Sequence, residues 1–426
     1  MANIQIQPLL KPVDASVEIP GSKSYTNRAL LMATMCKAPV RILRPLISDD
    51  TKAMMRCLKA LGIKISEKSD EIHVEGNIGD IKDGAYELDA DLSGTTIRFL
   101  LALLCVVPGI KTLKGKEGLN KRPIGDLVDG LRQCGAKIEY LEKEGFPPLR
   151  ISSSTLNPGT IRMKGDVSSQ FFSAILMIAP MIGEITIEVE GEQISKPYIA
   201  MTIDTMSRFG VPVANYEYKS YHIFGSQVYQ ASEYTVEGDA SSASYFAAIA
   251  ALTRSTITVM NVNPQSAQAD IRFFELLADM GNEVTYEKDA ITVHGTGVKP
   301  MEVSMEDCPD QAQTMAVLAA FADGVTKISG VRSLRVKETE RVKAVEKELE
   351  KMGIRTESTE DTLTIYGGDP KPAAIDTYGD HRMAMAFAVA GAKLDGMVIN
   401  DPGVVSKTFP LFWDKLESIG IKLDRI

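Results

Sequence analysis

The chain has 426 residues, of which 44% are hydrophobic and 24% charged, and its formal net charge is -9 at pH 7. This length exceeds one ordinary hydrophobic core, so at least two domains are expected. The acidic balance argues against a surface that follows nucleic-acid phosphates, because such surfaces carry a basic excess.

The apolar segments predict neither a membrane span nor a secretory leader. The longest runs, at residues 99–107 and 171–183, are shorter than the roughly 18 residues of a spanning helix. The first residues, MANIQIQPLLKP, lack the charged start, apolar run and cleavage site of a signal peptide. The five cysteines show no CxxC pairing and no zinc-ligand spacing. We therefore expect a cytoplasmic protein with reduced thiols.

Along the chain, six amphipathic helices each end at a glycine that leads into an alternating strand. The glycines recur about every 70 residues, at Gly62, Gly135, Gly210, Gly281, Gly353 and Gly420. Glycine just after a helix takes the left-handed cap conformation at little cost. Hairpin-like pairs follow several of them, as at residues 63–76 and 283–295.

A second series of helices, rich in Ala, Leu and Met, has the same period. Polar residues mark the starts of these helices, at Ser24, Ser93, Ser168, Ser241, Asp310 and Asp380. The helices are apolar nearly all round, which predicts burial at the centre of a domain. If they run parallel within a domain, their N-termini meet at one face, where their dipoles favour an anion.

Each copy of this pattern is interpreted as a small subdomain, because a period of about 70 residues is too long for a common solenoid repeat. Six copies of a strand, helix, strand, helix and hairpin fill the chain. They predict an α/β (α+β) fold with two domains of three units each.

Basic side chains at the helix starts oppose the helix dipole unless an anion is present. The stretch GSKSYTNRALLMA holds Lys23 and Arg28, with Ser22 or Ser24 as the expected cap. The full set of charged candidates is Lys23, Arg28, Arg122, Arg341, Arg382 and Lys407, with the carboxylates Asp310 and Glu338. Such a set suits a ligand with phosphate and carboxylate groups and leaves two carboxylates for proton transfer.

Two plainer interpretations stand beside this one. Lys23 and Arg28 also fit a solvated surface with a serine cap. Lys337 and Arg341, four residues apart with Glu338 between them, resemble any charged helix face.

Absent motifs narrow the chemistry. The sequence has no GxxxxGK[ST] phosphate loop, no HExxH, no GxSxG, and no GxGxxG between a strand and a helix. His73, His222 and His294 lie in strand-like segments without ligand-spaced partners, so no metal site is expected. Among the kinds of site considered, the sequence therefore favours one that binds a phosphorylated substrate without a nucleotide-binding loop.

Several motifs, in chain order, resemble the 5-enolpyruvylshikimate-3-phosphate synthase family of enolpyruvyl transferases. They are GSKSYTNRALLMA, KRPIGDLVDGLRQCGA, GDVSSQFFSAILM, SKPY, GDASSASYF, RVKETER, GDHRMAMAFAVAG and SKTFPLFW. The resemblance covers the whole chain. It implies two domains of three βαβαββ units around a cleft lined by helix N-termini. Residues 1–20 and 239–426 would form one domain and residues 21–238 the other, with a hinge near 20–21 and 238–239.

The resemblance also implies an activity. The family transfers the enolpyruvyl group of phosphoenolpyruvate to the 5-hydroxyl of shikimate 3-phosphate and releases phosphate, a step toward chorismate and the aromatic amino acids. It implies no metal and no organic cofactor. The implied partners are these two anionic substrates, with no nucleic acid and no membrane, and a monomer is expected.

By motif position the family implies three sets of site residues. The catalytic set is Asp310, Glu338, Lys23 and Lys407. The shikimate 3-phosphate set is Lys23, Ser24, Arg28, Ser168, Ser169, Gln170, Ser195, Tyr198, Asp310, Ser333 and Lys337. The phosphoenolpyruvate set is Lys23, Gly94, Arg122, Gln170, Arg341, Arg382 and Lys407.

Two alternatives and three departures accompany the resemblance. The related transferase that acts on UDP-N-acetylglucosamine uses a cysteine before its RP motif, but this chain has no cysteine between Cys105 and Cys134. A non-catalytic anion-binding homologue is the other alternative. The chain departs from the family pattern with Leu92 where asparagine is common, Phe99 where proline is frequent, and Ser333 where asparagine is usual.

Overall fold

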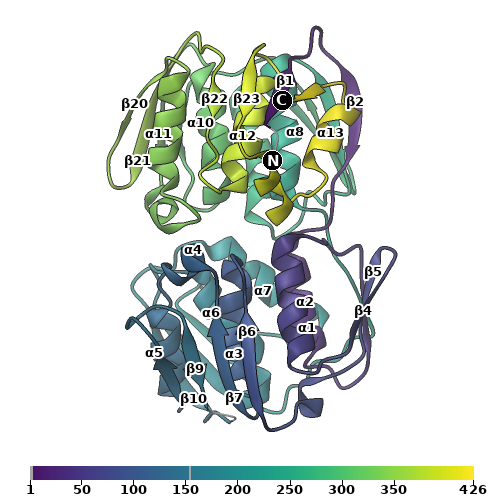
Figure 1. The fold of residues 1–426 in the computed structure, drawn as a ribbon, viewed down its shortest axis with the longest axis vertical. Coiled ribbons are helices and arrows are strands. Elements are labelled where there is room, and N and C mark those ends of the chain that lie inside the picture. The colour runs from purple at the N-terminus through teal and green to yellow at the C-terminus, as the bar shows by residue number, and fades with distance from the viewer. Residues whose placement is uncertain (1–2, 153–154) are drawn as a thin grey trace. The chain divides into compact units, whose positions relative to one another are not determined.

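The computed structural model describes residues 3–152 and 155–426 (Figure 1). It contains six four-stranded sheets with helices packed on them. By the contacts within it, the chain divides into two compact units. We call Gly21–Val236 the continuous unit, and the segment ending at Pro20 together with Glu237–Ile426 the discontinuous unit.

The continuous unit holds three sheets. In the order of the strands across each sheet, they are β14 (Glu233–Thr235), β3 (Val40–Leu43), β5 (Glu71–Val74) and β4 (Ile65–Lys68); β6 (Ala85–Asp89), β7 (Ile110–Lys114), β9 (Leu149–Ile151) and β8 (Ile138–Tyr140); and β10 (Gly159–Lys164), β11 (Ile185–Glu190), β13 (Ser220–Ile223) and β12 (Ala214–Tyr216). The helices are α1 (Lys23–Ala33), α2 (Asp49–Ala60), α3 (Gly94–Leu104), α4 (Glu117–Asn120), α5 (Gly125–Gln133), α6 (Ser169–Ile182) and α7 (Lys196–Arg208), with the 3-10 helix η1 (Ile78–Asp80).

The discontinuous unit repeats this plan. Its sheets are β16 (Glu283–Tyr286), β17 (Ala290–His294), β15 (Thr256–Met260) and β2 (Asp14–Glu18); β18 (Glu302–Ser304), β19 (Gly324–Ser329), β21 (Thr362–Gly367) and β20 (Arg355–Ser358); and β22 (Ala374–Ile375), β23 (Met397–Ile399), β1 (Ile4–Gln7) and β24 (Lys422–Arg425). The helices are α8 (Ala240–Thr253), α9 (Arg272–Asp279), α10 (Ala312–Ala320), α11 (Arg341–Lys351), α12 (His381–Gly391) and α13 (Phe412–Ser418). Four 3-10 helices join them: η2 (Ala269–Ile271), η3 (Pro309–Gln311), η4 (Arg332–Val336) and η5 (Pro402–Lys407).

Every sheet has one parallel pair, and five of the six have an antiparallel hairpin, as the repeat predicts. In the sixth sheet β1 takes the place of a hairpin strand and pairs antiparallel with β23 and β24. The register brings apolar residues together across neighbouring strands: Ile161 of β10 lies opposite Ile187 of β11, which lies opposite Tyr221 of β13. All three are fully buried. Alternation along each strand therefore turns one face of the sheet to the core and the other outward.

The expected helix ends and buried helices are confirmed. The six cap glycines have φ angles between 77° and 99°, in the left-handed region. All eleven residues of α3 are buried, and so are all eleven of α12. In the continuous unit α3 packs against α1 and α6, and in the discontinuous unit α12 packs against α8 and α10. These apolar helices form the centre of each unit. Across the described residues, none of the helices is long and apolar enough to cross a membrane.

Glycines stand next to both points where the chain leaves one unit for the other. A Cβ atom on Gly21 would lie 2.1 Å from the Arg44 carbonyl oxygen, and one on Gly238 would lie 1.8 Å from that of Asn261. Any other residue would clash with backbone at these positions. The sequence at the crossings is therefore restricted by close packing within each unit.

Candidate functional site

Arg341 is the centre of a buried ion-pair cluster in the discontinuous unit. It is the first residue of α11, and its side chain is 1% exposed. Its Nε donates to Asp380 Oδ2 at 2.7 Å, its Nη1 to Asp310 Oδ1 at 3.0 Å, and its Nη2 to Glu338 Oε2 at 2.9 Å. The interpretation of Arg341 as part of an exposed helix face is therefore wrong, because its planar fork is enclosed by three carboxylates.

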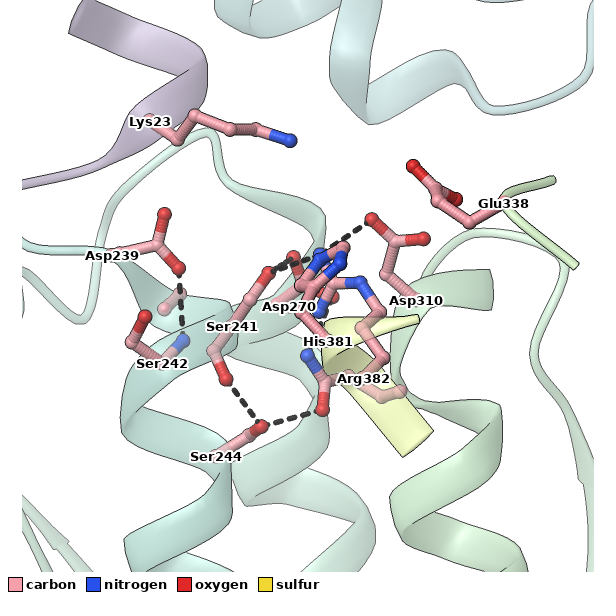
Figure 2. Close-up of polar contacts among 12 residues, drawn as sticks. Lys23, Asp239, Ser241, Ser242, Ser244, Asp270, Asp310, Glu338, His381 and Arg382 are labelled. Carbon is pink, nitrogen blue, oxygen red and sulfur yellow. Dashed lines mark hydrogen bonds and ion pairs between the residues drawn. The ribbon is translucent and has the colours of Figure 1, made fainter. Parts of the chain in front are cut away.

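Two further cations complete this cluster. Arg382 Nη2 donates to Asp310 Oδ2 at 2.7 Å, as Figure 2 shows, and Arg382 Nη1 donates to the Tyr245 hydroxyl at 3.2 Å. Lys407 Nζ donates to Glu338 Oε1 at 3.1 Å. We call Asp310, Glu338, Arg341, Asp380, Arg382 and Lys407 the Arg341 cluster. It contains three positive and three negative side chains, brought together from η3, α11, α12, η5 and the residues beside them.

The cluster keeps the Arg341 guanidinium charged. Burial alone would lower the pKa of Arg341, but the charges of Asp380, Glu338 and Asp310 outweigh burial and raise it. An arginine in this position therefore remains a fixed cation that orients the carboxylates around it.

His381 adds no charge to this cluster at neutral pH. It is the first residue of α12 and is buried. Burial, together with the charges of Arg382 and Lys407, lowers the pKa of His381 well below its usual value. The imidazole is therefore neutral at pH 7.

Asp380 and Asp310 owe their positions to local structure. Asp380 is the N-cap of α12, and its Oδ1 accepts from the Arg382 backbone N–H at 2.9 Å. Asp310 lies in η3, just before α10. The predicted residues Ser333 and Lys337 lie within and next to η4, which packs against η3.

The continuous unit carries the second group of predicted residues. Lys23, the first residue of α1, forms an ion pair with the buried Asp50 of α2, with Nζ and Oδ2 at 3.5 Å. On α6, the Gln170 side-chain oxygen accepts from Arg98 Nη1 of α3 at 2.6 Å. Lys23 and Gln170 are thus each held by a charged neighbour that the sequence interpretation left out of the site.

Gly94 and Arg122 also lie together in the continuous unit. A Cβ atom on Gly94 would stand 2.8 Å from Arg122 Nη1 and 3.1 Å from Arg122 Cζ. The glycine at the start of α3 therefore leaves room for this guanidinium. Leu92, at one position where the chain departs from the family pattern, is 41% exposed just before this helix.

Arg28 lies in the interior of the continuous unit. Its guanidinium donates to the carbonyl oxygens of Ser24 and Tyr198, both at 3.1 Å, and to Thr202 Oγ1 at 2.8 Å. It also lies 5.3 Å from the ring centre of Phe99. Burial lowers its pKa to about 10. These contacts tie α1 to α7 and fix the backbone beside two other predicted residues.

The predicted serines lie at helix starts, but their caps differ from expectation. Ser22 occupies the N-cap of α1 and Ser168 that of α6, yet neither side chain makes a capping hydrogen bond. Ser24 lies inside α1, so the expected cap by Ser22 or Ser24 is wrong. Ser169 is the first residue of α6 and Ser195 the N-cap of α7, with Tyr198 in the first turn of that helix. Neither α1 nor α6 is therefore capped by the side chain of its N-cap serine.

Residues 3–152 and 155–426 contain no group of three His, Cys, Asp or Glu side chains that could hold a metal ion. The described histidines on strands make ordinary contacts instead: His222 Nδ1 lies 2.9 Å from Thr186 Oγ1, and His294 Nδ1 lies 3.1 Å from Thr256 Oγ1.

Comparison with known proteins decides the family. The model of the EPSP synthase family (3-phosphoshikimate 1-carboxyvinyltransferase) matches residues 9–416. The chain belongs to the EPSP synthase family.

Curated EPSP synthase relatives match nearly the full length. The 3-phosphoshikimate 1-carboxyvinyltransferase of Sulfurovum sp. (strain NBC37-1) is 43% identical over 425 residues, covering 98% of this chain and 99% of that protein. The protein of the same name from Shewanella amazonensis is 41% identical, with the same shares covered. A solved structure of EPSP synthase from Acinetobacter baumannii has a TM-score of 0.84 at 24% identity and covers 100% of both chains, which shows the shared fold.

Proposed function

We propose that the chain is a 3-phosphoshikimate 1-carboxyvinyltransferase, the activity for which its curated EPSP synthase relatives are named. It transfers the enolpyruvyl group of phosphoenolpyruvate to the 5-hydroxyl of shikimate 3-phosphate. The observation that carries the proposal is the Arg341 cluster, in which three buried cations and three carboxylates meet in a chain of this family. The UDP-N-acetylglucosamine transferase and a non-catalytic homologue are not favoured by these relatives.

The reaction needs one proton acceptor and one proton donor. A proton added to the CH2 carbon of phosphoenolpyruvate makes its neighbouring carbon electrophilic. The 5-hydroxyl oxygen then bonds to that neighbouring carbon and loses its own proton, which gives a tetrahedral intermediate. Loss of a proton from the new methyl group and departure of phosphate restore the double bond. Each atom is accounted for, and no redox step occurs.

The cluster supplies groups for these steps. Asp310 takes the hydroxyl proton, and Glu338, Lys407 or Lys23 protonates the CH2 carbon. Glu338 and Lys407 share a hydrogen bond of 3.1 Å, so either can pass a proton to the other. Arg341 and Arg382 hold anionic groups of the substrate by charge-assisted hydrogen bonds and offset the charge that develops on the departing phosphate.

The binding assignments follow the motif positions. Shikimate 3-phosphate is held by Lys23, Ser24, Arg28, Ser168, Ser169, Gln170, Ser195, Tyr198, Asp310, Ser333 and Lys337. Phosphoenolpyruvate is held by Lys23, Gly94, Arg122, Gln170, Arg341, Arg382 and Lys407. Lys23 is the first residue of α1 and Gln170 the second residue of α6, and their place at helix starts, where the helix dipole favours a phosphate, supports this assignment.

We also propose that residues 1–20 with 239–426, and residues 21–238, act as two domains with a hinge near 20–21 and 238–239. A change in the small-angle X-ray scattering profile on addition of both substrates would support this, and an unchanged profile would contradict it. The protein is proposed to be a cytoplasmic monomer that does not bind nucleic acid, in keeping with its net charge of -9.

A phosphate-release assay tests the proposed activity. Purified protein is mixed with phosphoenolpyruvate and either shikimate 3-phosphate, UDP-N-acetylglucosamine or no acceptor. We expect release with shikimate 3-phosphate alone. Release with the nucleotide sugar would favour the alternative transferase, and the absence of release with every acceptor would favour a non-catalytic homologue.

A further inference from the structure

Asp270 is a buried carboxylate that the reaction proposed above does not use. It lies in η2, before α9, and is 4% exposed. Its Oδ2 accepts a hydrogen bond from Ser241 Oγ at 2.6 Å, and its Oδ1 accepts one from Gln311 Nε2 at 3.1 Å. Figure 2 shows Asp270 next to Ser241 and Arg382.

Both hydrogen bonds lead to the Arg341 cluster. Ser241 Oγ lies 3.5 Å from Arg382 Nη2, the nitrogen that also binds Asp310. Gln311 directly follows Asp310 in η3, and its side-chain oxygen accepts from the Ser244 hydroxyl of α8. The Gln311 amide is therefore held at both ends. Through one intervening side chain in each direction, Asp270 reaches Arg382 and the segment that carries Asp310.

The ionised form of Asp270 is costly at this place. Burial raises its pKa to about 6, with Arg382 opposing the rise and the carboxylates of Asp310 and Asp239 adding to it. Cys308, which precedes η3, also faces Asp270, and burial raises the pKa of that thiol to about 12. Asp270 is thus a charged group at pH 7 that the fold holds against a desolvation cost.

The hydrogen bonds alone do not require this charge. Asparagine at position 270 would accept from Ser241 through its oxygen. If the Gln311 side-chain amide flips, its oxygen would accept from the new NH2 group and its nitrogen would donate to Ser244 Oγ. The Ser244 hydroxyl would then donate to the Ser241 carbonyl oxygen, which is 2.7 Å away. Every polar atom would keep a partner, so the negative charge itself calls for a functional explanation.

We propose, on the basis of the enolpyruvyl transfer proposed above, that Asp270 is a positioning residue. Its ionised carboxylate holds Arg382 through Ser241, and the Asp310 segment through Gln311, in the arrangement that the reaction needs. The charged and titratable groups that face it are Arg382 from α12, Asp310 and Cys308 from the η3 segment, and Asp239 at the N-cap of α8.

The kinetic test uses Asp270→Asn, with Asp279→Asn as the matched control, because Asp279 is exposed at the end of α9. Phosphate release with both substrates is measured from pH 5 to pH 8. We expect kcat of the wild type to rise with pH as a group with a pKa near 6 ionises. We expect Asp270→Asn to lose this inflection and to have kcat lower by about tenfold, because neutral hydrogen bonds replace charge-assisted ones, which are roughly twice as strong. Its KM for phosphoenolpyruvate should not increase, since the change removes a negative charge near Arg382. Asp279→Asn should behave as the wild type.

A stability measurement separates positioning from a structural role. The pKa of Asp270 in the folded protein lies above its unfolded value of about 4. Between about pH 4 and pH 6 the folded state therefore binds a proton that the unfolded state lacks, and this contribution to stability is lost as pH rises. We expect the urea midpoint of Asp270→Asn at pH 7 to equal or exceed that of the wild type. A purely structural carboxylate would give a lower midpoint, which would overturn the proposal.

A second variant tests one arm of the connection. Ser241→Ala removes the hydroxyl between Asp270 and Arg382 but retains the carboxylate. We expect kcat/KM for phosphoenolpyruvate to fall by about tenfold, with the inflection near pH 6 retained. Unchanged kcat in Asp270→Asn, or an inflection that persists in it, would overturn the proposal. An inactive wild type would contradict the proposed function instead. The proposal on Asp270 would then be tested by stability alone. If the urea midpoints of the wild type and Asp270→Asn differ by the same amount from pH 4 to pH 7, Asp270 does not ionise in this range.

Discussion

Replacement of Arg341 by lysine would keep the charge of the Arg341 cluster and remove its planar fork. Three different nitrogens of the guanidinium bind Asp380, Asp310 and Glu338 at 2.7, 3.0 and 2.9 Å. A lysine ammonium is one nitrogen and cannot occupy all three donor positions. Each charge-assisted hydrogen bond contributes about 1.5–3 kcal/mol, so the loss of two costs about 3 kcal/mol or more. Solvent offers little compensation at a side chain that is 1% exposed.

Two measurements check this expectation. Trp413, the single tryptophan, is buried in α13 of the discontinuous unit and reports unfolding there by its fluorescence in urea. We expect the free energy of unfolding to fall by about 3 kcal/mol or more, and kcat/KM to fall by about a hundredfold. The control is Arg355→Lys on β20, whose ion pair with Glu357 is exposed, so this change should leave the free energy of unfolding almost unchanged. If Arg341→Lys matches the control in both measurements, the three-carboxylate arrangement does not support the reaction.

Three further predictions concern single contacts. Asp310→Asn should lower kcat by about 10² to 10⁴ if Asp310 is the general base, and wild-type turnover in this variant would remove it from that role. Gly94→Ala should displace Arg122, whose Nη1 lies 2.8 Å from the position of the new methyl group, and should raise KM for phosphoenolpyruvate. The control is Gly368→Ala, which has open space around its Cβ position, and equal KM values in the two variants would contradict the assignment of Gly94 and Arg122 to phosphoenolpyruvate. Tyr378→Phe removes a 2.6 Å hydrogen bond to the buried Glu348 and should cost about 1–2 kcal/mol of unfolding free energy, discounted because Tyr378 is 38% exposed. Tyr366→Phe, at an exposed bond to Glu357, should cost almost nothing, and equal losses in the two variants would refute the role of burial.

The fold could be predicted from the sequence to the level of its repeat. Glycines such as Gly62 and Gly353 end helices in the left-handed conformation, which is a local preference that does not depend on distant residues. The spacing of these glycines along the sequence therefore reveals the structural repeat. Capping could not be predicted as well. Ser22 is a favoured cap residue at the right position, yet its side chain makes no capping hydrogen bond, because the choice of partner depends on neighbours that the local sequence does not contain.

The candidate site was predictable where a motif carries charge next to an apolar helix, as in Arg382. The residues that hold such groups were harder to find. Asp50 beside Lys23, Arg98 beside Gln170 and Asp270 beside Ser241 act across elements far apart in sequence. No spacing rule connects residues that meet only after the sheets and central helices have packed, so these partners required the structure.

The pairing of the first strands has a consequence for synthesis of the chain. β1 pairs with β23 and β24, and β2 pairs with β15, so both strands are made long before their partners, the last of which ends at Arg425. The continuous unit, by contrast, has every strand of its three sheets before β15 is made. Because domains fold as units during translation, this middle section can fold first while β1 and β2 remain unpaired. These strands have only four and five residues, which limits the unpaired edge exposed to other nascent chains. The sheet that contains β1 closes only after β24 has been made.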